Sequence, residues 1–326
     1  MKKVVDNPRL IYKCCKLYYE NNCSQNEIAD IIGISRVSVS RLLKAGRDEG
    51  IVQIRVISPN QLGYSELEND LENLFHLKEA VVIEHDPLAT SFDEQAEIRK
   101  AAISLLETCL ENGDVVGVSM GRTLYNICGE NTGAVGQFDC TFVPVVGGIS
   151  VSGSSVNAVH SNQIARGFAE LFGSEYIEFF APAMFSDKTI LQGFMKEKMA
   201  RRIQEYYRRM RTVIMGIGTP NHAMSTMIRG GYIRQNEIER MVEAGMVGDI
   251  SLQYFDREGR TEAFRSFNDR VAGLSLEEMK TVENRICIGT GSRKAEALLG
   301  AIQGGFVNIL ITDSECAQKL IEFKKG

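Results

Sequence analysis

Two glycine-rich segments of this 326-residue chain carry the side chains that proteins use to bind phosphate groups. The first is Gly117–Thr123, with the sequence GVSMGRT, and the second is Gly289–Lys294, with the sequence GTGSRK. Each follows an apolar run and precedes a predicted helix, so backbone N–H groups and the helix dipole would favour an anion. Hydroxyl, arginine and lysine side chains would add charge-assisted hydrogen bonds to that anion.

Two other segments add groups that suit a sugar. Gly147 and Gly148 follow another apolar run, and Asp249 follows Gly248 in an expected loop, where its carboxylate could accept hydrogen bonds from sugar hydroxyls. A glycine after a strand is often only a turn, and residues 216–218 (GIG) lack the spacing of a dinucleotide-binding loop. The two cationic loops and the carboxylate together favour a phosphorylated polyhydroxy ligand.

A third set of polar side chains lies near the N-terminus, on the outward face of a predicted helix. That face carries Arg36, Val37, Ser38, Ser40, Arg41 and Lys44, and Ser35 caps the helix. Guanidinium and hydroxyl groups on one helix face suit guanine edges and phosphate oxygens in the major groove of DNA. These seven residues are therefore the predicted DNA-binding residues.

Capping residues and apolar spacing predict how this face is positioned. After a first amphipathic helix, Ser24 and Glu27 form a capping box that begins a second helix. Gly33 makes the tight turn that leads into the third helix. Two short helices joined by such a turn indicate a helix-turn-helix. The alternating residues Ile51–Ile57 then predict a strand, which we interpret as part of a wing.

The charge of the chain is unevenly distributed. Residues 1–57 hold 10 Lys and Arg against 6 Asp and Glu, a net charge of +4, whereas the whole chain carries −5 and the remainder therefore −9. A small basic unit on an acidic body fits nucleic-acid contact at one end of the chain. The alternative is a three-helix interaction module that binds no DNA.

Beyond a predicted linker at residues 58–60, apolar strands alternate with helices. Strands are predicted over Ala80–Glu84, Val115–Val118, Thr141–Val146, Ile177–Ala181, Val213–Gly216, Arg285–Gly289 and Val307–Thr312. Helices are predicted over Glu66–Phe75, Asp93–Glu111, Val159–Phe172, Lys196–Arg209, Arg293–Ile302 and Ser314–Glu322. This alternation predicts an α/β fold with a doubly wound, mostly parallel sheet, in which ligands bind at the carboxyl ends of the strands. The expected domains are residues 1–57 and 58–326.

The composition is typical of a soluble globular protein, with 44% hydrophobic and 24% charged residues. No apolar run is long enough to span a bilayer and the N-terminus lacks a secretory signal, so we expect a cytoplasmic protein without membrane contact. The eight cysteines form no C-x-x-C pair, and with the four histidines they give no metal-ligand spacing. We expect reduced, mostly buried thiols, no metal and no cofactor.

Taken in order, these motifs resemble the SorC family of sugar-responsive bacterial regulators. The resemblance covers nearly the whole chain, and its markers are Ser24–Leu43, Gly117–Leu124, Val143–Ser150, Gly245–Phe255, Gly289–Ala297 and Asn308–Asp313. It implies a winged helix-turn-helix joined to a domain similar to sugar-phosphate isomerases and deaminases. It also implies a homo-oligomer, a dimer or tetramer, whose affinity for DNA changes when a sugar phosphate binds.

The resemblance assigns the effector site residue by residue. The effector-binding residues it implies are Ser119, Gly121, Arg122, Thr123, Gly147, Gly148, Asp249, Gly291, Ser292, Arg293 and Lys294. Some relatives carry a lysine just before the paired glycines, where this chain has Val146. The resemblance therefore implies reversible binding rather than covalent attachment through a Schiff base.

The sequence as a whole predicts a transcriptional regulator that binds double-stranded operator DNA. A phosphorylated sugar would control its affinity for the operator of a carbohydrate-catabolic operon. The alternative is a sugar-phosphate isomerase or deaminase, but that chemistry needs a positioned general base, and Asp249 is the one candidate. A constitutive DNA-binding oligomer whose sensor pocket has decayed is a further alternative.

Overall fold

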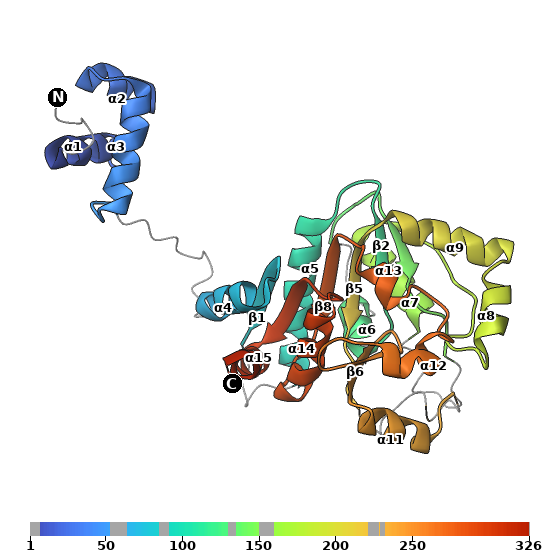
Figure 1. Cartoon of the computed structure of the whole chain (residues 1–326). Coiled ribbons are helices and arrows are strands. Elements are labelled where there is room, and N and C mark those ends of the chain that lie inside the picture. The colour runs from blue at the N-terminus through green and yellow to red at the C-terminus, as the bar shows by residue number, and fades with distance from the viewer. Residues whose placement is uncertain are drawn as a thin grey trace. The chain divides into compact units, whose positions relative to one another are not determined.

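The chain folds into two compact units, Met1–Gln61 and Leu62–Gly326 (Figure 1). The computed structural model describes residues 7–52, 64–84, 91–129, 135–149, 160–220, 228 and 232–325. Each unit has a hydrophobic core of its own. The predicted boundary at residue 57, the predicted linker and most of the predicted wing strand lie outside the described residues.

The described residues of the smaller unit form three helices, α1 (Pro8–Tyr19), α2 (Gln25–Ile32) and α3 (Arg36–Asp48). The predicted capping box begins α2, because the Ser24 N–H donates to Glu27 Oε2 (2.8 Å) and the Glu27 N–H donates to Ser24 Oγ (3.3 Å). A cap of this kind stabilises a helix by about 1 kcal/mol. Gly33 ends α2 with a φ of +75°, so the prediction of a left-handed turn is confirmed.

The core of the smaller unit fixes how α3 is oriented. Its buried side chains are Ile11, Cys14, Cys15, Ile28, Val39, Leu42 and Leu43. The α3 residues of this set occupy the face that turns towards α1 and α2, as the apolar spacing predicted. The polar face of α3 is consequently left at the surface.

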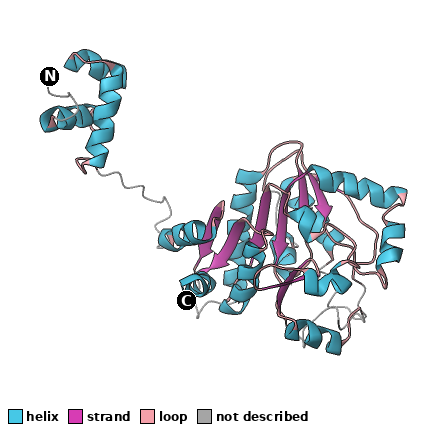
Figure 2. Cartoon of the chain, viewed as in Figure 1, coloured by secondary structure: helices cyan, strands magenta, loops and turns pink. Residues whose placement is uncertain are grey.

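The larger unit is built on a seven-stranded parallel sheet in the order β1-β9-β8-β5-β2-β3-β4 (Figure 2). The strands are β1 (Glu79–Ile83), β2 (Val115–Val118), β3 (Thr141–Pro144), β4 (Glu175–Tyr176), β5 (Met210–Gly216), β8 (Asn284–Ile288) and β9 (Ile309–Asp313). Two further strands, β6 (Met246–Ile250) and β7 (Gln253–Asp256), form a separate antiparallel hairpin.

Helices cover both faces of the sheet, which confirms the predicted doubly wound architecture. One core contains side chains of α4 (Ser65–Phe75), α9 (Lys198–Arg209), α13 (Leu276–Met279), α14 (Ala295–Gln303) and α15 (Ser314–Lys325). The core on the opposite face contains side chains of α5 (Ser91–Cys109), α6 (Arg122–Cys128) and α7 (Ser161–Phe172). The remaining described helices with bounds are α8 (Lys188–Phe194), α11 (Gln235–Glu243) and α12 (Arg265–Asn268), with short 3₁₀ turns η4 (Glu262–Phe264) and η5 (Ser292–Lys294).

The strand order places a topological switch point between β2 and β5. From β2 the chain moves outward to β3 and β4, and from β5 it moves outward in the other direction to β8 and β9. Because the connections after β2 and β5 run in opposite directions, a crevice forms at the carboxyl ends of these two strands. Open α/β sheets bind their ligands in such a crevice.

Three local predictions were wrong. Residues Ile177–Ala181, predicted as a strand, follow β4 and are not part of it. The Phe179 N–H donates to the side-chain oxygen of Asn162 on α7, and the Asn162 amide donates to the Phe179 carbonyl, so the backbone of Phe179 is not free to pair with a strand. Asp249 lies in β6 and not in a loop. The helix predicted from Arg293 begins at Ala295, after η5.

All eight cysteines are free, and five of them (Cys14, Cys15, Cys140, Cys287 and Cys316) are buried. Burial raises the pKa of the Cys287 thiol to about 12 and that of Cys316 to about 11, so both remain protonated at neutral pH. None of the described helices combines the length and the apolarity that a membrane span requires.

Candidate functional site

The carboxyl end of β2 is held against the β6–β7 hairpin by two hydroxyl groups. Ser119 is buried, its N–H donates to the Ile214 carbonyl (3.0 Å), and its hydroxyl lies 2.8 Å from the hydroxyl of Ser251. Ser251 forms the tip of the hairpin with Leu252, and both have a positive φ (50° and 67°). This strained tip brings a residue far away in the sequence to the switch point of the sheet.

Asp249 lies at the same place, opposite the end of β5. Its backbone pairs with Gly218 through two hydrogen bonds (2.9 and 3.2 Å), and its Oδ2 accepts the N–H of Leu252 (3.1 Å). Burial raises the pKa of the Asp249 carboxyl to about 6, against the lowering effect of that hydrogen bond. A side chain at Gly218 would clash with Asp249 Oδ1, so it would have to displace the carboxylate from its present position.

The loop after β2 ends in an exposed cation at the start of α6. Gly121 has a φ of +133°, a conformation that favours glycine, and Arg122 follows it with its side chain exposed. No carboxylate among the described residues forms an ion pair with Arg122. Thr123 is partly buried one residue further on. The arrangement offers a guanidinium to an incoming anion.

The loop after β8 differs from this arrangement. Gly291 has a φ of +85°, and its N–H donates to Oδ2 of the buried Asp313 (2.5 Å), while the N–H of Ser292 donates to Glu315 Oε2 (3.4 Å). Two of the N–H groups that could cradle an anion are thus already bound to carboxylates of the chain. The neighbouring Arg293 side chain is exposed.

Lys294, the second cation of this loop, is only partly exposed. Burial lowers the pKa of its ammonium group, an effect that the nearby Asp313 partly offsets by favouring the charged form. Lys294 therefore lies close to the buried cysteines of β8 and α15, in a less solvated position than Arg122 or Arg293.

The paired glycines after β3 serve close packing. The Gly147 N–H donates to the Ala272 carbonyl (2.9 Å) and the Gly148 N–H donates to the Ala181 carbonyl (2.8 Å). A Cβ atom on Gly147 would lie 2.6 Å from the carbonyl oxygens of Ala181 and Pro182, too close for any side chain. Gly147 thus lets the chain segments meet closely beside β3, whereas a Cβ atom at Gly148 would make only an ordinary contact with the Ala181 carbonyl.

The polar face of α3 is exposed as predicted. Arg36, Val37, Ser40, Arg41 and Lys44 are all exposed. Of the remaining two predicted DNA-binding residues, Ser35 caps the helix and Ser38 is partly buried in its first turn. The Ser38 N–H donates to Ser35 Oγ (3.2 Å), and the two hydroxyls lie 2.9 Å apart.

Comparison with known proteins identifies both units. Residues 60–322 match a family described as "Putative sugar-binding domain", and residues 16–62 match the Crp-like helix-turn-helix domain. The sorbitol operon regulator of Klebsiella pneumoniae is 30% identical, over 97% of this chain and 99% of that protein. The chain belongs to the SorC family of sugar-binding transcriptional regulators.

Further members of the SorC family match over a similar length. The deoxyribonucleoside regulator of Bacillus subtilis is 29% identical, over 97% of this chain and 98% of its own length. The crystal structure of the full-length sorbitol operon regulator from Klebsiella pneumoniae superposes with a TM-score of 0.70 at 28% identity, covering 96% of this chain and 98% of that one. This SorC-family protein is accordingly a DNA-binding, sugar-responsive transcriptional regulator and not an enzyme.

Sequence reasoning missed two residues of the candidate site in this SorC-family protein. Gly218 belongs to the GIG segment, which lacks the spacing of a dinucleotide-binding loop. Its position just after β5, at the carboxyl end of a strand, could nevertheless have indicated a site residue. Ser251 carried no signal, because nothing in its neighbourhood predicts that it meets Ser119, 132 positions away.

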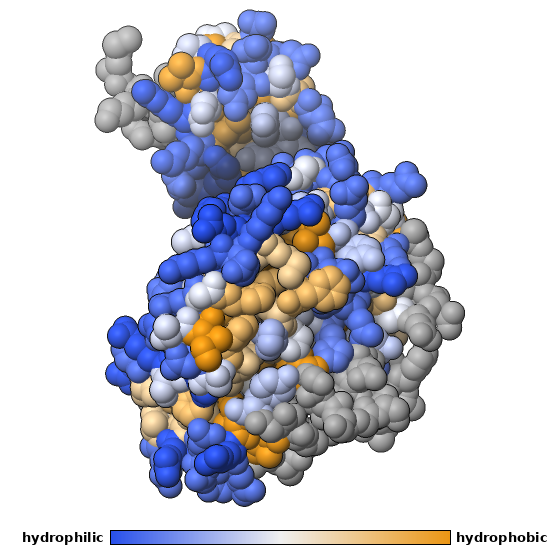
Figure 3. Space-filling view, turned by 90° about the vertical axis from the view of Figure 1, so that its right-hand side faces the viewer, coloured by the Kyte–Doolittle hydropathy of each residue, from blue (hydrophilic) through white to orange (hydrophobic). Residues whose placement is uncertain are grey.

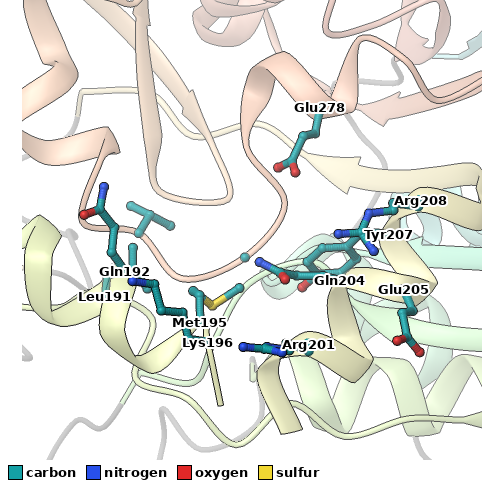
Figure 4. A pocket seen from close by; sticks show the side chains of 12 residues that line it. Leu191, Gln192, Met195, Lys196, Arg201, Gln204, Glu205, Tyr207, Arg208 and Glu278 are labelled. Carbon is teal, nitrogen blue, oxygen red and sulfur yellow. The ribbon is translucent and has the colours of Figure 1, made fainter. Parts of the chain in front are cut away.

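A groove of about 730 Å³ lies elsewhere on the larger unit, between α8, α9 and the segment around Val271 and Gly273 (Figure 4). Its lining includes three cations, Lys196, Arg201 and Arg208, and two carboxylates, Glu205 and Glu278, but none of the predicted effector-binding residues. Figure 3 views the molecule from the side of α8 and α9 and shows apolar surface interspersed with polar surface there. The groove is thus a rival location for an anionic ligand.

Proposed function

We propose that a phosphorylated sugar binds at the carboxyl ends of β2 and β5, and that its binding changes the affinity of the protein for operator DNA. One observation carries this proposal: the Ser119–Ser251 contact and the Asp249–Gly218 pairing bring a hydroxyl pair, a carboxylate and the Arg122 loop to the switch point of the sheet. A phosphate and a polyhydroxy chain are the groups that this set of side chains suits.

Each part of the site has a distinct role in the proposal. Arg122, Gly121 and Thr123 would bind the phosphate, and Asp249 would accept hydrogen bonds from sugar hydroxyls. Gly147 and Gly148 would shape the wall of the site beside β3. From the loop after β8, Arg293 and Lys294 would add positive charge, next to Gly291 and Ser292.

Binding would be reversible. Val146, which stands where some relatives carry a lysine, is fully buried and offers no amine to a sugar aldehyde. The names of two relatives, a sorbitol operon regulator and a deoxyribonucleoside regulator, support control of a carbohydrate-catabolic operon.

The operator would be contacted by the α3 face, through Ser35, Arg36, Val37, Ser38, Ser40, Arg41 and Lys44. A single helix-turn-helix makes few base contacts, so we propose that the protein acts as a dimer or tetramer on spaced half-sites, in the cytoplasm. The sugar phosphate must bind one subunit arrangement better than the other in order to change operator affinity.

The test is a thermal-shift screen of the full-length protein against phosphorylated sugars, each beside its unphosphorylated parent. A ligand at a hundredfold excess over its Kd stabilises the folded protein by about 2.7 kcal/mol, which such a screen detects. We expect one sugar phosphate, and not its parent, to raise the melting temperature. If parent sugars gave equal shifts, the phosphate-binding role of the Arg122 loop would be wrong.

A further inference from the structure

Val37 is an apolar side chain on the exposed, otherwise polar face of α3. Its exposed fraction is 61%, whereas Val39, two residues along the same helix, is fully buried. A single exposed apolar residue is common on protein surfaces and has no meaning by itself. Val37 differs from such residues because it lies in the first turn of α3, on the face predicted to contact DNA.

Val37 begins a stripe of exposed residues along α3. Ser40, Arg41 and Lys44 follow it at spacings of three, four and seven residues, which is the spacing of one helix face. The stripe is therefore apolar at its N-terminal end and cationic further along. In helix-turn-helix proteins the N-terminal part of the recognition helix contacts base edges.

The conformation of Val37 is well defined. The Ser35–Ser38 cap fixes the first turn of α3 around it, and a β-branched side chain in a helix strongly prefers one rotamer. The Ser38 hydroxyl, already bonded to Ser35, is less available for base contacts than the valine beside it. Val37 thus presents a rigid apolar surface to whatever the helix contacts.

We propose that Val37 selects thymine at one position of the operator by packing against its 5-methyl group in the major groove. This inference rests on the proposed contact between α3 and the operator. The thymine methyl is the apolar group that base pairs display in the major groove, where the other features are hydrogen-bond donors and acceptors. Valine can satisfy none of those, so any other base at this position would lose solvation without compensation.

The experiment replaces thymine with deoxyuridine, which removes the methyl group and keeps every hydrogen-bonding group. The probe is a duplex selected from a random-sequence pool by the full-length protein, with each thymine replaced in turn. We expect deoxyuridine at one position, and at its symmetry mate, to weaken binding about fivefold, as loss of one buried methyl contact would. Val37→Ala should bind the thymine duplex about fivefold more weakly and show no further loss with deoxyuridine.

The matched control is Ile31→Ala, which removes an apolar side chain of similar exposure (55%) from α2. This variant should keep the full deoxyuridine effect. Thermal unfolding of both variants checks that the smaller unit stays folded, as expected for substitutions of exposed residues.

Three results would overturn the inference. If the deoxyuridine effect persisted undiminished in Val37→Ala, or if no thymine were sensitive in the wild-type protein, Val37 would not recognise the methyl group, while operator binding by α3 would stand. If the selected duplex bound with unchanged affinity to Val37→Ala and Arg41→Ala alike, the proposed operator contact of α3 would fail as well.

Discussion

The two binding surfaces of this regulator are built in different ways. The polar face of α3 comes from nine consecutive residues, 36–44, and a local cap and turn position it. The proposed effector site combines the ends of β2 and β5 with the tip of a hairpin, where Ser119 meets Ser251. A surface contained in one helix depends on that helix, whereas a surface assembled at a switch point depends on the packing of the whole sheet.

This difference makes the two surfaces separable by mutation. Substitutions of Arg36, Val37, Ser40, Arg41 and Lys44 on the α3 face should change DNA binding alone, because these side chains are exposed. Substitutions in the effector site should change ligand binding, and those at its close-packed backbone contacts should also change stability. The predictions below test this separation, beginning with the largest effect.

The largest effect is expected for Arg122→Ala. Removing the guanidinium deletes a charge-assisted contact to the phosphate, and we expect effector affinity to fall about a hundredfold. Operator affinity without effector should not change. Thermal shift and fluorescence anisotropy measure the two affinities on the same preparation.

Arg201→Ala is the control for this experiment, because it removes an exposed arginine of the same unit that lines the groove of Figure 4. It should leave effector affinity intact. The opposite pattern, in which Arg201→Ala abolishes the shift and Arg122→Ala does not, would move the effector site to the groove between α8 and α9.

Gly218→Ala should weaken the effector by about thirtyfold, since the new methyl group would clash with Asp249 Oδ1 and displace the carboxylate. The melting temperature of the larger unit should also fall. Gly216→Ala is a close control, because a Cβ atom at Gly216 meets no atom within 4 Å. If both substitutions weakened effector binding equally, the loss would come from any added side chain at the end of β5 and not from displacement of Asp249.

The structure of the smaller unit could be predicted from the sequence more fully than the effector site of the larger unit. In the smaller unit, Ser24, Glu27, Gly33 and Ser35 act within four residues of themselves, so the capping box, the turn and the start of α3 were predictable. In the larger unit, the strands and helices were predictable from their apolar runs, but the residues that meet at the switch point depend on the order of the strands. Sequence spacing holds no information on that order.

Two of the three wrong predictions have the same origin. Phe179 was predicted in a strand from its apolar neighbours, yet Asn162 on α7 binds its backbone instead. Asp249 was expected in a loop because glycine precedes it, but β6 needs that glycine for its close approach to α14, where a Cβ atom would lie 2.6 Å from Ala297 Cβ. In both cases a tertiary contact outweighed the local pattern.

On the α3 side, Arg41→Ala should reduce operator affinity about tenfold and lower the salt dependence of binding by about one counterion. The effector-induced thermal shift should stay the same, because Arg41 is exposed and lies in the smaller unit. Lys16→Ala, which removes an exposed cation from α1, serves as the control. A change in effector affinity in Arg41→Ala would contradict the separation of the two surfaces.

The smallest effect concerns pH. Because burial raises the pKa of Asp249 to about 6, its carboxylate is present above pH 6 and is lost as the pH falls through that value. Effector affinity should therefore drop about twofold between pH 7.5 and pH 6, where half of the carboxyl groups are protonated. Calorimetric titration at several pH values measures this change.

Stability should respond to the same group with the opposite sign. The pKa of Asp249 is higher in the folded protein than its ordinary value, so this group favours the folded state below pH 4 and loses that contribution as the pH rises through 6. Lowering the pH from 7.5 to 6 should thus reduce the affinity for the effector. The contribution of Asp249 to the free energy of unfolding of the ligand-free protein should increase over the same range. The phosphate of the ligand titrates in the same range, so Asp249→Asn isolates the contribution of Asp249. In that variant the remaining pH dependence of effector affinity comes from other groups. If effector affinity changed with pH as it does in the wild-type protein, Asp249 would not be part of the effector site.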